Sequence, residues 1–280
     1  MPAFKQEQHC LFLGNCWNGG IPMNKFIRQF ALLTGWLVLF ATPASTLAKD
    51  LNEWTLEEVL HSIAEANGGL ESIENVTNAR FFGEIVTEEG AKDFLLLKRR
   101  PNMVRSRLSD SNGAMETGFD GEIGWQRFER SGFDKVVQIE DPKRVRSLLL
   151  DSDFDGALIG DPQEGVTRRL AGIERIDRVD YFIIEVLSPS GTTQHYIDFR
   201  TFRELKTVKI TQSEDGEESR IVSLYHDNRK HSGIWVSHRV ERELPDGSKE
   251  TILIHDVEMN PGILSRAFRM PEEYNPVPES

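Results

Sequence analysis

The segment Asp151–Gly156 reads DSDFDG, which places three aspartates at alternate positions before a glycine. Carboxylates with this spacing begin the loop of an EF-hand calcium site. Such a loop needs a bidentate glutamate at its twelfth position, but that position is Pro162 and Glu164 comes two residues later. The loop also needs a second helix, whereas residues 165–173 alternate like a strand. We therefore interpret DSDFDG as a helix end and turn whose aspartates cap backbone amides.

Histidines are the second set of residues that could bind a metal. None of them occurs in HxH or HExxH spacing, which favours scattered surface side chains over a metal centre. The chain also lacks a GxSxG elbow and a phosphate-binding loop, and nothing marks out one pair of its many carboxylates. The sequence therefore favours a protein that is not an enzyme and uses no cofactor or metal. The histidines concerned are His195, His226, His231, His238 and His255.

The start of the chain predicts export. Lys25 and Arg28 follow Met23 and precede an apolar run over residues 30–41, and small residues ending at Ala48 fit a cleavage site. This is the pattern of a secretory signal peptide. A membrane anchor is the alternative, but the apolar run is shorter than the ~20 residues that span a bilayer. We expect Met23 to be the true start and residues 1–22 to be an upstream extension.

The chain that follows the predicted cleavage has 232 residues (280 − 48) and no cysteine, because Cys10 and Cys16 lie upstream. It must therefore form a core without disulfides. The whole chain has a net charge of −12 and its first 48 residues carry +2, so the remainder carries −14. This charge provides no general attraction to nucleic acid. We expect a single monomeric domain over residues 49–270 and a loose, proline-rich tail over residues 271–280.

Two helices can be located from local signals. Thr55 and Glu58 form a capping box before an apolar stripe that ends at Asn67–Gly69. A second short turn follows at residues 70–76. In the middle of the chain, Asp141 can cap a helix whose first residue is Pro142.

The rest of the chain alternates with a period of two, which predicts strands. Asp120-Gly121 and Pro245-Asp246-Gly247 are hairpin turn signals. A long antiparallel sheet with one apolar face must be covered, and with only two substantial helices it should curl around them. The expected strands cover residues 81–88, 93–99, 103–109, 123–128, 165–173, 181–187, 193–199, 204–211, 219–226, 233–242 and 249–259.

Apolar residues on one face of these strands are the candidates for the lining of a ligand cavity. This prediction assumes that the more apolar face of each strand points inward, and a shift of one residue would reverse a strand. The space between sheet and helices can be a closed core or a cavity. The predicted lining residues are Phe94, Leu96, Phe182, Ile184, Val186, Ile197, Phe199, Val208 and Ile210.

The run KRRPNMVRSR, residues 98–107, is basic within an acidic chain. One interpretation is a solvated strand–turn–strand. The other is a docking patch for an acidic partner or a lipid headgroup.

Several stretches, in this order, resemble the LolA-like family of periplasmic lipoprotein-sorting proteins. Their order and spacing over residues 68–259 are more specific than any one of them alone. The run KRRPNMVR is similar to the family's KRPNKVR, FDGEIGW to YDGKTGW, DFDGALI to DFDGPL, and GIWVSHR to GVWFPHRI. These stretches, with the family-like opening after the first helix, are Asn67–Ile73, Lys98–Arg105, Phe119–Trp125, Asp153–Ile159 and Gly233–Arg239.

This resemblance implies a mainly β fold, an unclosed antiparallel β-barrel whose concave apolar face is covered by helices. It implies a periplasmic carrier that binds the acyl chains of a lipoprotein or another lipid non-covalently and sorts it towards the outer membrane. An inner-membrane exporter and an outer-membrane receptor would be its partners. A lipoprotein-sensing regulator or protein-binding module of the same fold is the alternative. DSDFDG then belongs to the fold and not to a calcium site.

Overall fold

The computed structural model describes residues 53–212 and 216–272. The predicted signal peptide, the upstream extension, both cysteines and most of the predicted tail lie outside these residues. No helix within the described ranges is long and apolar enough to cross a membrane. The described elements are α1 (Leu56–Ala66), α2 (Leu70–Glu74), β1 (Asn78–Thr87), β2 (Gly90–Arg99), β3 (Met103–Asp110), β4 (Gly113–Phe119), β5 (Gly124–Arg130), β6 (Phe133–Gln138), α3 (Pro142–Ser152), β7 (Thr167–Ile176), β8 (Val179–Ser188), β9 (Gly191–Asp198), β10 (Glu204–Gln212), β11 (Glu218–His231), β12 (Ile234–Glu243), β13 (Lys249–Met259) and η2 (Ser265–Phe268).

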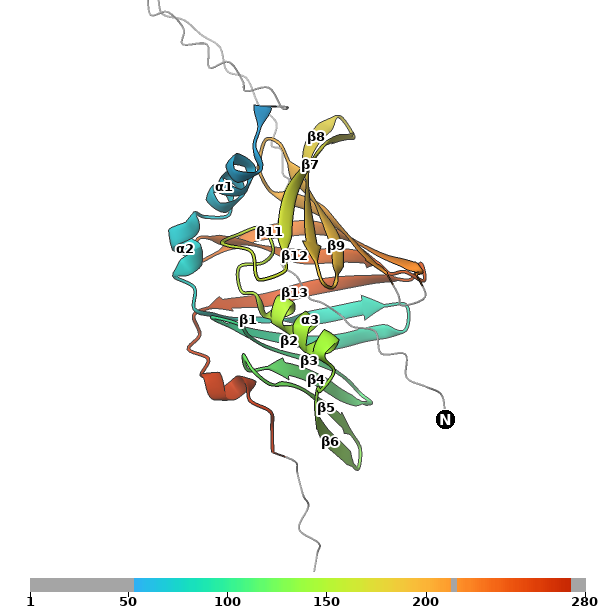
Figure 1. The fold of residues 1–280 in the computed structure, drawn as a ribbon. Helices are drawn as coiled ribbons and strands as arrows, with labels where there is room; N and C mark the ends of the chain where they lie inside the picture. The colour runs from blue at the N-terminus through green and yellow to red at the C-terminus, as the bar shows by residue number, and fades with distance from the viewer. Residues whose placement is uncertain (1–52, 213–215, 273–280) are drawn as a thin grey trace, which may run out of the picture.

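The strands form one antiparallel sheet of 13 strands that curls around α1 and α3 without closing (Figure 1). Each strand pairs with its neighbour in sequence, except that α3 and its following loop separate β6 from β7. The pairing of β1 with β13 joins the two halves. The sheet ends at β6 and β7, which confirms the predicted unclosed half-barrel. The order is β6-β5-β4-β3-β2-β1-β13-β12-β11-β10-β9-β8-β7.

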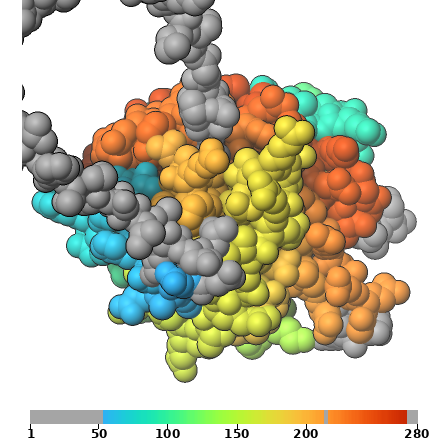
Figure 2. Space-filling model, turned by 90° about the horizontal axis from the view of Figure 1, so that it is seen from above, coloured from blue at the N-terminus to red at the C-terminus, as the bar shows by residue number. Residues whose placement is uncertain are grey.

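The predicted capping box begins α1. Thr55 accepts a hydrogen bond from the backbone of Glu58 at 3.3 Å, and the Glu58 carboxylate accepts one from the backbone of Thr55 at 2.8 Å. The apolar stripe of α1 includes Val59 and Ile63, which pack against Phe182 on β8. In the view from above, the surface of α1 (blue) adjoins that of β7 and β8 (yellow) (Figure 2). This helix therefore covers the second half of the sheet.

The first half of the sheet is covered by α3. Asp141 caps this helix by accepting a hydrogen bond from the Lys143 backbone at 3.0 Å, and Pro142 begins it, as predicted. Leu148 and Leu149 pack against the buried residues of β1 to β4 and of β11 to β13. The helix and the loop after it run across the concave face of the sheet (Figure 1). This helix and its following loop therefore cover the concave face next to α1.

Two strands were not predicted. The edge strand β6 has mixed polarity, and β4 contains two glycines, so neither has a clear period. The register of β4 and β5 pairs Phe119 with Gly124, so their loop has four residues, Asp120–Ile123, and not the two predicted from Asp120-Gly121. Asp120 stabilises this longer loop because its carboxylate accepts hydrogen bonds from the Glu122 and Ile123 backbones.

The C-terminal segment covers the outer face of the first half-sheet. Trp125 on β5 points to this face and donates a hydrogen bond from its indole nitrogen to the carbonyl of Phe268 at 2.8 Å. Both side chains are fully buried. Gly118 on β4 makes room for the indole, since a β-carbon there would lie 2.2 Å from the ring. The tryptophan of the FDGEIGW stretch is thus an anchor for residues 260–268.

Candidate functional site

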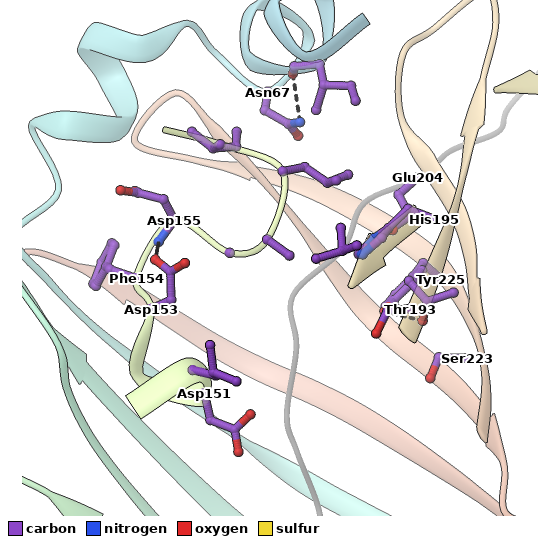
Figure 3. Close-up of a pocket in the computed structure, with 18 of the residues that line it drawn as sticks. Asn67, Asp151, Asp153, Phe154, Asp155, Thr193, His195, Glu204, Ser223 and Tyr225 are labelled. Atoms are coloured by element: carbon purple, nitrogen blue, oxygen red, sulfur yellow. Dashed lines mark hydrogen bonds and ion pairs between the residues drawn. The ribbon is translucent and has the colours of Figure 1, made fainter. Parts of the chain in front are cut away.

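A cavity of about 270 Å³ lies between the concave face of the sheet, the two N-terminal helices and the loop after α3. Figure 3 shows this loop, with Asp153, Phe154 and Asp155, facing the strands that carry His195 and Tyr225. One part of the wall is apolar and combines side chains from α1, α2, the loop and the sheet. Its members are Ile63, Ile73, Ala79, Phe81, Ala157, Leu158, Val186, Ile197, Val236, Val240, Ile252 and Met259.

The structure places the predicted lining residues in four environments, three of them on the inner side of the sheet. Val186 and Ile197 line the cavity. Phe94 and Leu96 also belong to the inner core but are packed among the buried residues of the first half-sheet. Phe182, Ile184 and Phe199 lie under α1, where Trp54 contacts both phenylalanine rings. These five residues form the packed base around the cavity, and their role in binding stays a prediction.

Val208 and Ile210 face the opposite way. They pack with Ile183, Tyr196 and Val222 in a cluster on the outer side of β8 to β11. Their neighbours Thr207 and Lys209 line the cavity instead. The assumption that the more apolar face of every strand points inward is therefore wrong for β10. The prediction fails because β8 to β10 bury apolar residues on both faces. The face with more apolar residues therefore does not identify the inner side.

The basic run and DSDFDG meet at the edge of the cavity. Arg100 forms an ion pair with Asp155 and lies over the ring of Phe154 at 4.6 Å. The same guanidinium donates to the carbonyls of Ile73 and Val76 at 2.9 and 2.8 Å. Arg100 therefore fixes the loop after α3 both to α2 and to the residues that follow α2. The guanidinium of Arg100 is thus engaged in contacts within the protein.

Lys98 makes a second contact with the same loop. It is buried, and its ammonium donates a hydrogen bond to the carbonyl of Asp153. Burial lowers the pKa of Lys98 to about 8, although Asp153, Asp151 and Asp155 act in the opposite direction. Burial likewise raises the pKa of Asp153, against the effect of Lys98. Burial of the charged forms of Lys98 and Asp153 therefore lowers the stability of the fold.

We expect Lys98 to make stability rise at alkaline pH. Its folded-state pKa lies below the unfolded value of 10.5, so the unfolded chain binds more protons and the fold is penalised at neutral pH. This penalty disappears as the pH rises from about 8 towards 10.5. From this group alone, the free energy of unfolding should increase by about 2 kcal/mol between pH ~7.5 and ~9.5. Urea unfolding at these two pH values measures it.

Lys98→Met should remove this increase, whereas Lys92→Met should retain it because Lys92 is exposed on the same strand. An equal pH dependence in wild type and Lys98→Met would contradict the assignment of a charged, desolvated Lys98.

The cavity also has a polar side, formed by β9 to β12. His195, Thr207, Ser223 and Arg242 line it and are all buried, and the hydroxyl of Tyr225 lies among them. The sequence analysis named His195 only among the histidines that could bind a metal and named none of the others. The alternation of β9 did contain a signal for one of them, because His195 has the same parity as the predicted Ile197.

DSDFDG and the histidines hold the side chains that could bind a metal. Within residues 53–212 and 216–272, no group of three or more His, Cys, Asp or Glu side chains could hold a metal ion. His231 and His238 contact each other through their Nε2 atoms at 2.8 Å, and His238 Nδ1 contacts the carbonyl of Ile254 at 2.6 Å. Burial lowers the pKa of both rings, which favours their neutral forms. The carboxylate of Asp155 faces Arg100.

Comparison with known proteins gives structural similarity only. No protein-family model and no curated protein matches the sequence. A crystal structure of a DUF1329 family protein from Desulfovibrio piger has a TM-score of 0.54 and 11% identity, covering 77% of this chain and 97% of that one. A LolA superfamily protein from Nitrosomonas europaea has a TM-score of 0.52 and 13% identity, covering 77% and 98%. Together with the unclosed sheet and its covering helices, these similarities show that the chain has a LolA-like fold.

Proposed function

We propose that this protein is a periplasmic carrier that binds the acyl chains of a lipoprotein or another lipid non-covalently and sorts it towards the outer membrane. It carries out no covalent chemistry. Its partners would be an inner-membrane exporter that loads it and an outer-membrane receptor that unloads it.

The observation that carries the proposal is the covered cavity on the concave face. Its apolar side is built from α1, α2, the loop after α3 and five strands, so an acyl chain placed there would be shielded from water. Burying each methylene group contributes about 0.8 kcal/mol, which is why an exposed chain needs such a shield in the periplasm. The predicted signal peptide supports the same compartment.

Loading requires the cavity to open, and the loop after α3 is the part best placed to move. It has no regular structure between α3 and β7, and it crosses the concave face as a single layer. Lys98 and Arg100 hold its first residues, and Arg168 of β7 donates to the carbonyls of Ile159 and Gly160 further along. Covering loops without regular structure are the usual moving elements of a binding protein.

Mass spectrometry of organic extracts tests the proposal directly. The protein would be exported, purified from the periplasm without detergent, and extracted. A stoichiometric lipid or lipoprotein is the expected result. An empty protein that also fails to bind fluorescent acyl probes would contradict it. A stable protein partner in pulldowns would then favour the alternative, a regulatory or protein-binding module.

A further inference from the structure

Polar side chains form a continuous row across the concave face of the second half-sheet. The strand registers pair His195 with Thr207, Thr207 with Ser223, Ser223 with Arg242, and Arg242 with Glu250. We call these five residues the polar row. Because adjacent strands lie about 4.8 Å apart, the part from His195 to Arg242 crosses roughly 14 Å of the sheet. Each of the five is 8% exposed or less.

Apolar residues flank the polar row on the same inner face. Ile197 lies two residues beyond His195, Val240 two residues before Arg242, and Ile252 two residues beyond Glu250, so all three belong to the same inner face. Packing of the sheet against its helices does not require hydroxyls or charges here. Burying them costs stability unless they are hydrogen-bonded.

Hydrogen bonds within the site provide partners for most polar atoms of the row. His195 Nδ1 contacts the Glu204 carboxylate at 2.5 Å, and the Arg242 guanidinium donates to Glu250 at 2.7 Å. The hydroxyls of Thr207 and Tyr225 lie 3.1 Å apart. Burial, with a further effect of Glu204, raises the pKa of Tyr225, which keeps its hydroxyl protonated.

Two atoms at the ends of this stretch remain without a hydrogen-bond partner among the described residues, His195 Nε2 and Arg242 Nε. Both belong to side chains that line the cavity and are more than nine-tenths buried as residues. His195 Nδ1 faces a carboxylate, so Nε2 is the ring nitrogen left for a ligand, and a hydroxyl can pair with it as donor or as acceptor. The Arg242 Nε–H offers a donor.

These features define the chemistry of a complementary group. The His195 ring and the Arg242 guanidinium already face Glu204 and Glu250, so an anionic headgroup would meet these two carboxylates without a free positive charge. A bare hydrocarbon would leave the two unpartnered atoms buried. An uncharged group with a hydroxyl for Nε2 and a carbonyl acceptor for Nε satisfies both conditions.

We propose that the polar row binds the uncharged, hydroxyl-bearing head of an acyl ester, of the acylglycerol type, while the chain occupies the apolar side of the cavity. This inference rests on the proposed carrier function and narrows its ligand class. It assigns His195 and Arg242 as the residues that distinguish such an ester from a free fatty acid.

Calorimetric titration of the purified protein with two ligands of equal chain length, 1-monolauroylglycerol and laurate, tests this assignment. The informative variant is His195→Asn, since the asparagine side chain can still face Glu204 but lacks the Nε2 position. It should weaken 1-monolauroylglycerol binding about 3- to 10-fold, the value of one neutral hydrogen bond, and leave laurate binding unchanged. Ser223→Ala removes one hydroxyl of the row with little change of shape and should also weaken the ester selectively. The matched control is His226→Asn, a half-buried histidine that faces the outer side of β11.

The outcomes separate this inference from the carrier function. Binding of both ligands with equal effects of His195→Asn on each, or with no effect, would overturn the role of the polar row and leave the carrier intact. It would indicate that bound water satisfies the row. Binding of neither ligand would overturn both proposals.

Discussion

Thr193→Trp should abolish the binding of acyl ligands. Thr193 lies on β9 with its side chain directed into the cavity (Figure 3). An indole at this position would fill the space between the strands and the loop after α3. A strand accepts an aromatic residue well, so the substitution should block the cavity and leave the fold in place. The affinity for 1-monolauroylglycerol, measured by calorimetry, should fall by at least about tenfold, since a blocked cavity loses more than 1.4 kcal/mol of binding energy.

The adjacent residue provides a matched control. Thr192 is the same residue type, is equally half-buried, and pairs with Ile210 on the outer face. Thr192→Trp should therefore bind the ligand as the wild type does. Thermal unfolding of both variants shows whether the fold is retained. Equal binding by Thr193→Trp and wild type would mean that the ligand does not occupy this cavity, which would contradict the proposed function.

Local sequence signals predicted the covering helices α1 and α3 better than they predicted the residues that line the cavity. The capping box of α1 depends on residues three positions apart, and the cap of α3 on residues two apart, so the sequence contains both. The family-like stretches likewise indicated the right fold. The contact between the stretches KRRPNMVR and DFDGALI was not predictable, because Arg100 and Asp155 lie 55 residues apart and no sequence period relates them.

The lining of the cavity depends on which face of each strand points inward, and β10 shows why alternation is insufficient. Val208 is apolar and fully buried, yet it lies on the outer side, where Tyr196 and Val222 flank it. Thr207 faces the cavity because its register places it between His195 and Ser223. Only the pairing of five strands, β9 to β13, brings the members of the polar row together. Such register is a non-local property of the sheet.

Arg100→Met should destabilise the fold and loosen the cover of the cavity. The side chains of Arg100 and Asp155 are 25% and 19% exposed, so their ion pair is mostly desolvated. Removing Arg100 takes this donor from the Asp155 carboxylate and from the carbonyl of Val76, while the carbonyl of Ile73 keeps its bond from the Val76 backbone. Breaking a fully buried pair costs 3–5 kcal/mol, and for this partly exposed one we expect about 2–4 kcal/mol in urea unfolding. Amide hydrogen exchange should accelerate most in residues 153–166.

The exposed pair of Arg80 and Glu258 is the appropriate control, since its side chains are 44% and 41% exposed. Arg80→Met should cost less than about 1 kcal/mol and leave exchange in residues 153–166 unchanged. If Arg100 holds the cover closed, Arg100→Met should also release bound ligand faster than wild type, because opening no longer has to break the ion pair. Unchanged exchange and ligand release in Arg100→Met would place the gate elsewhere. The two family-like stretches would then serve stability alone, and the movement that admits a ligand would have to come from α1.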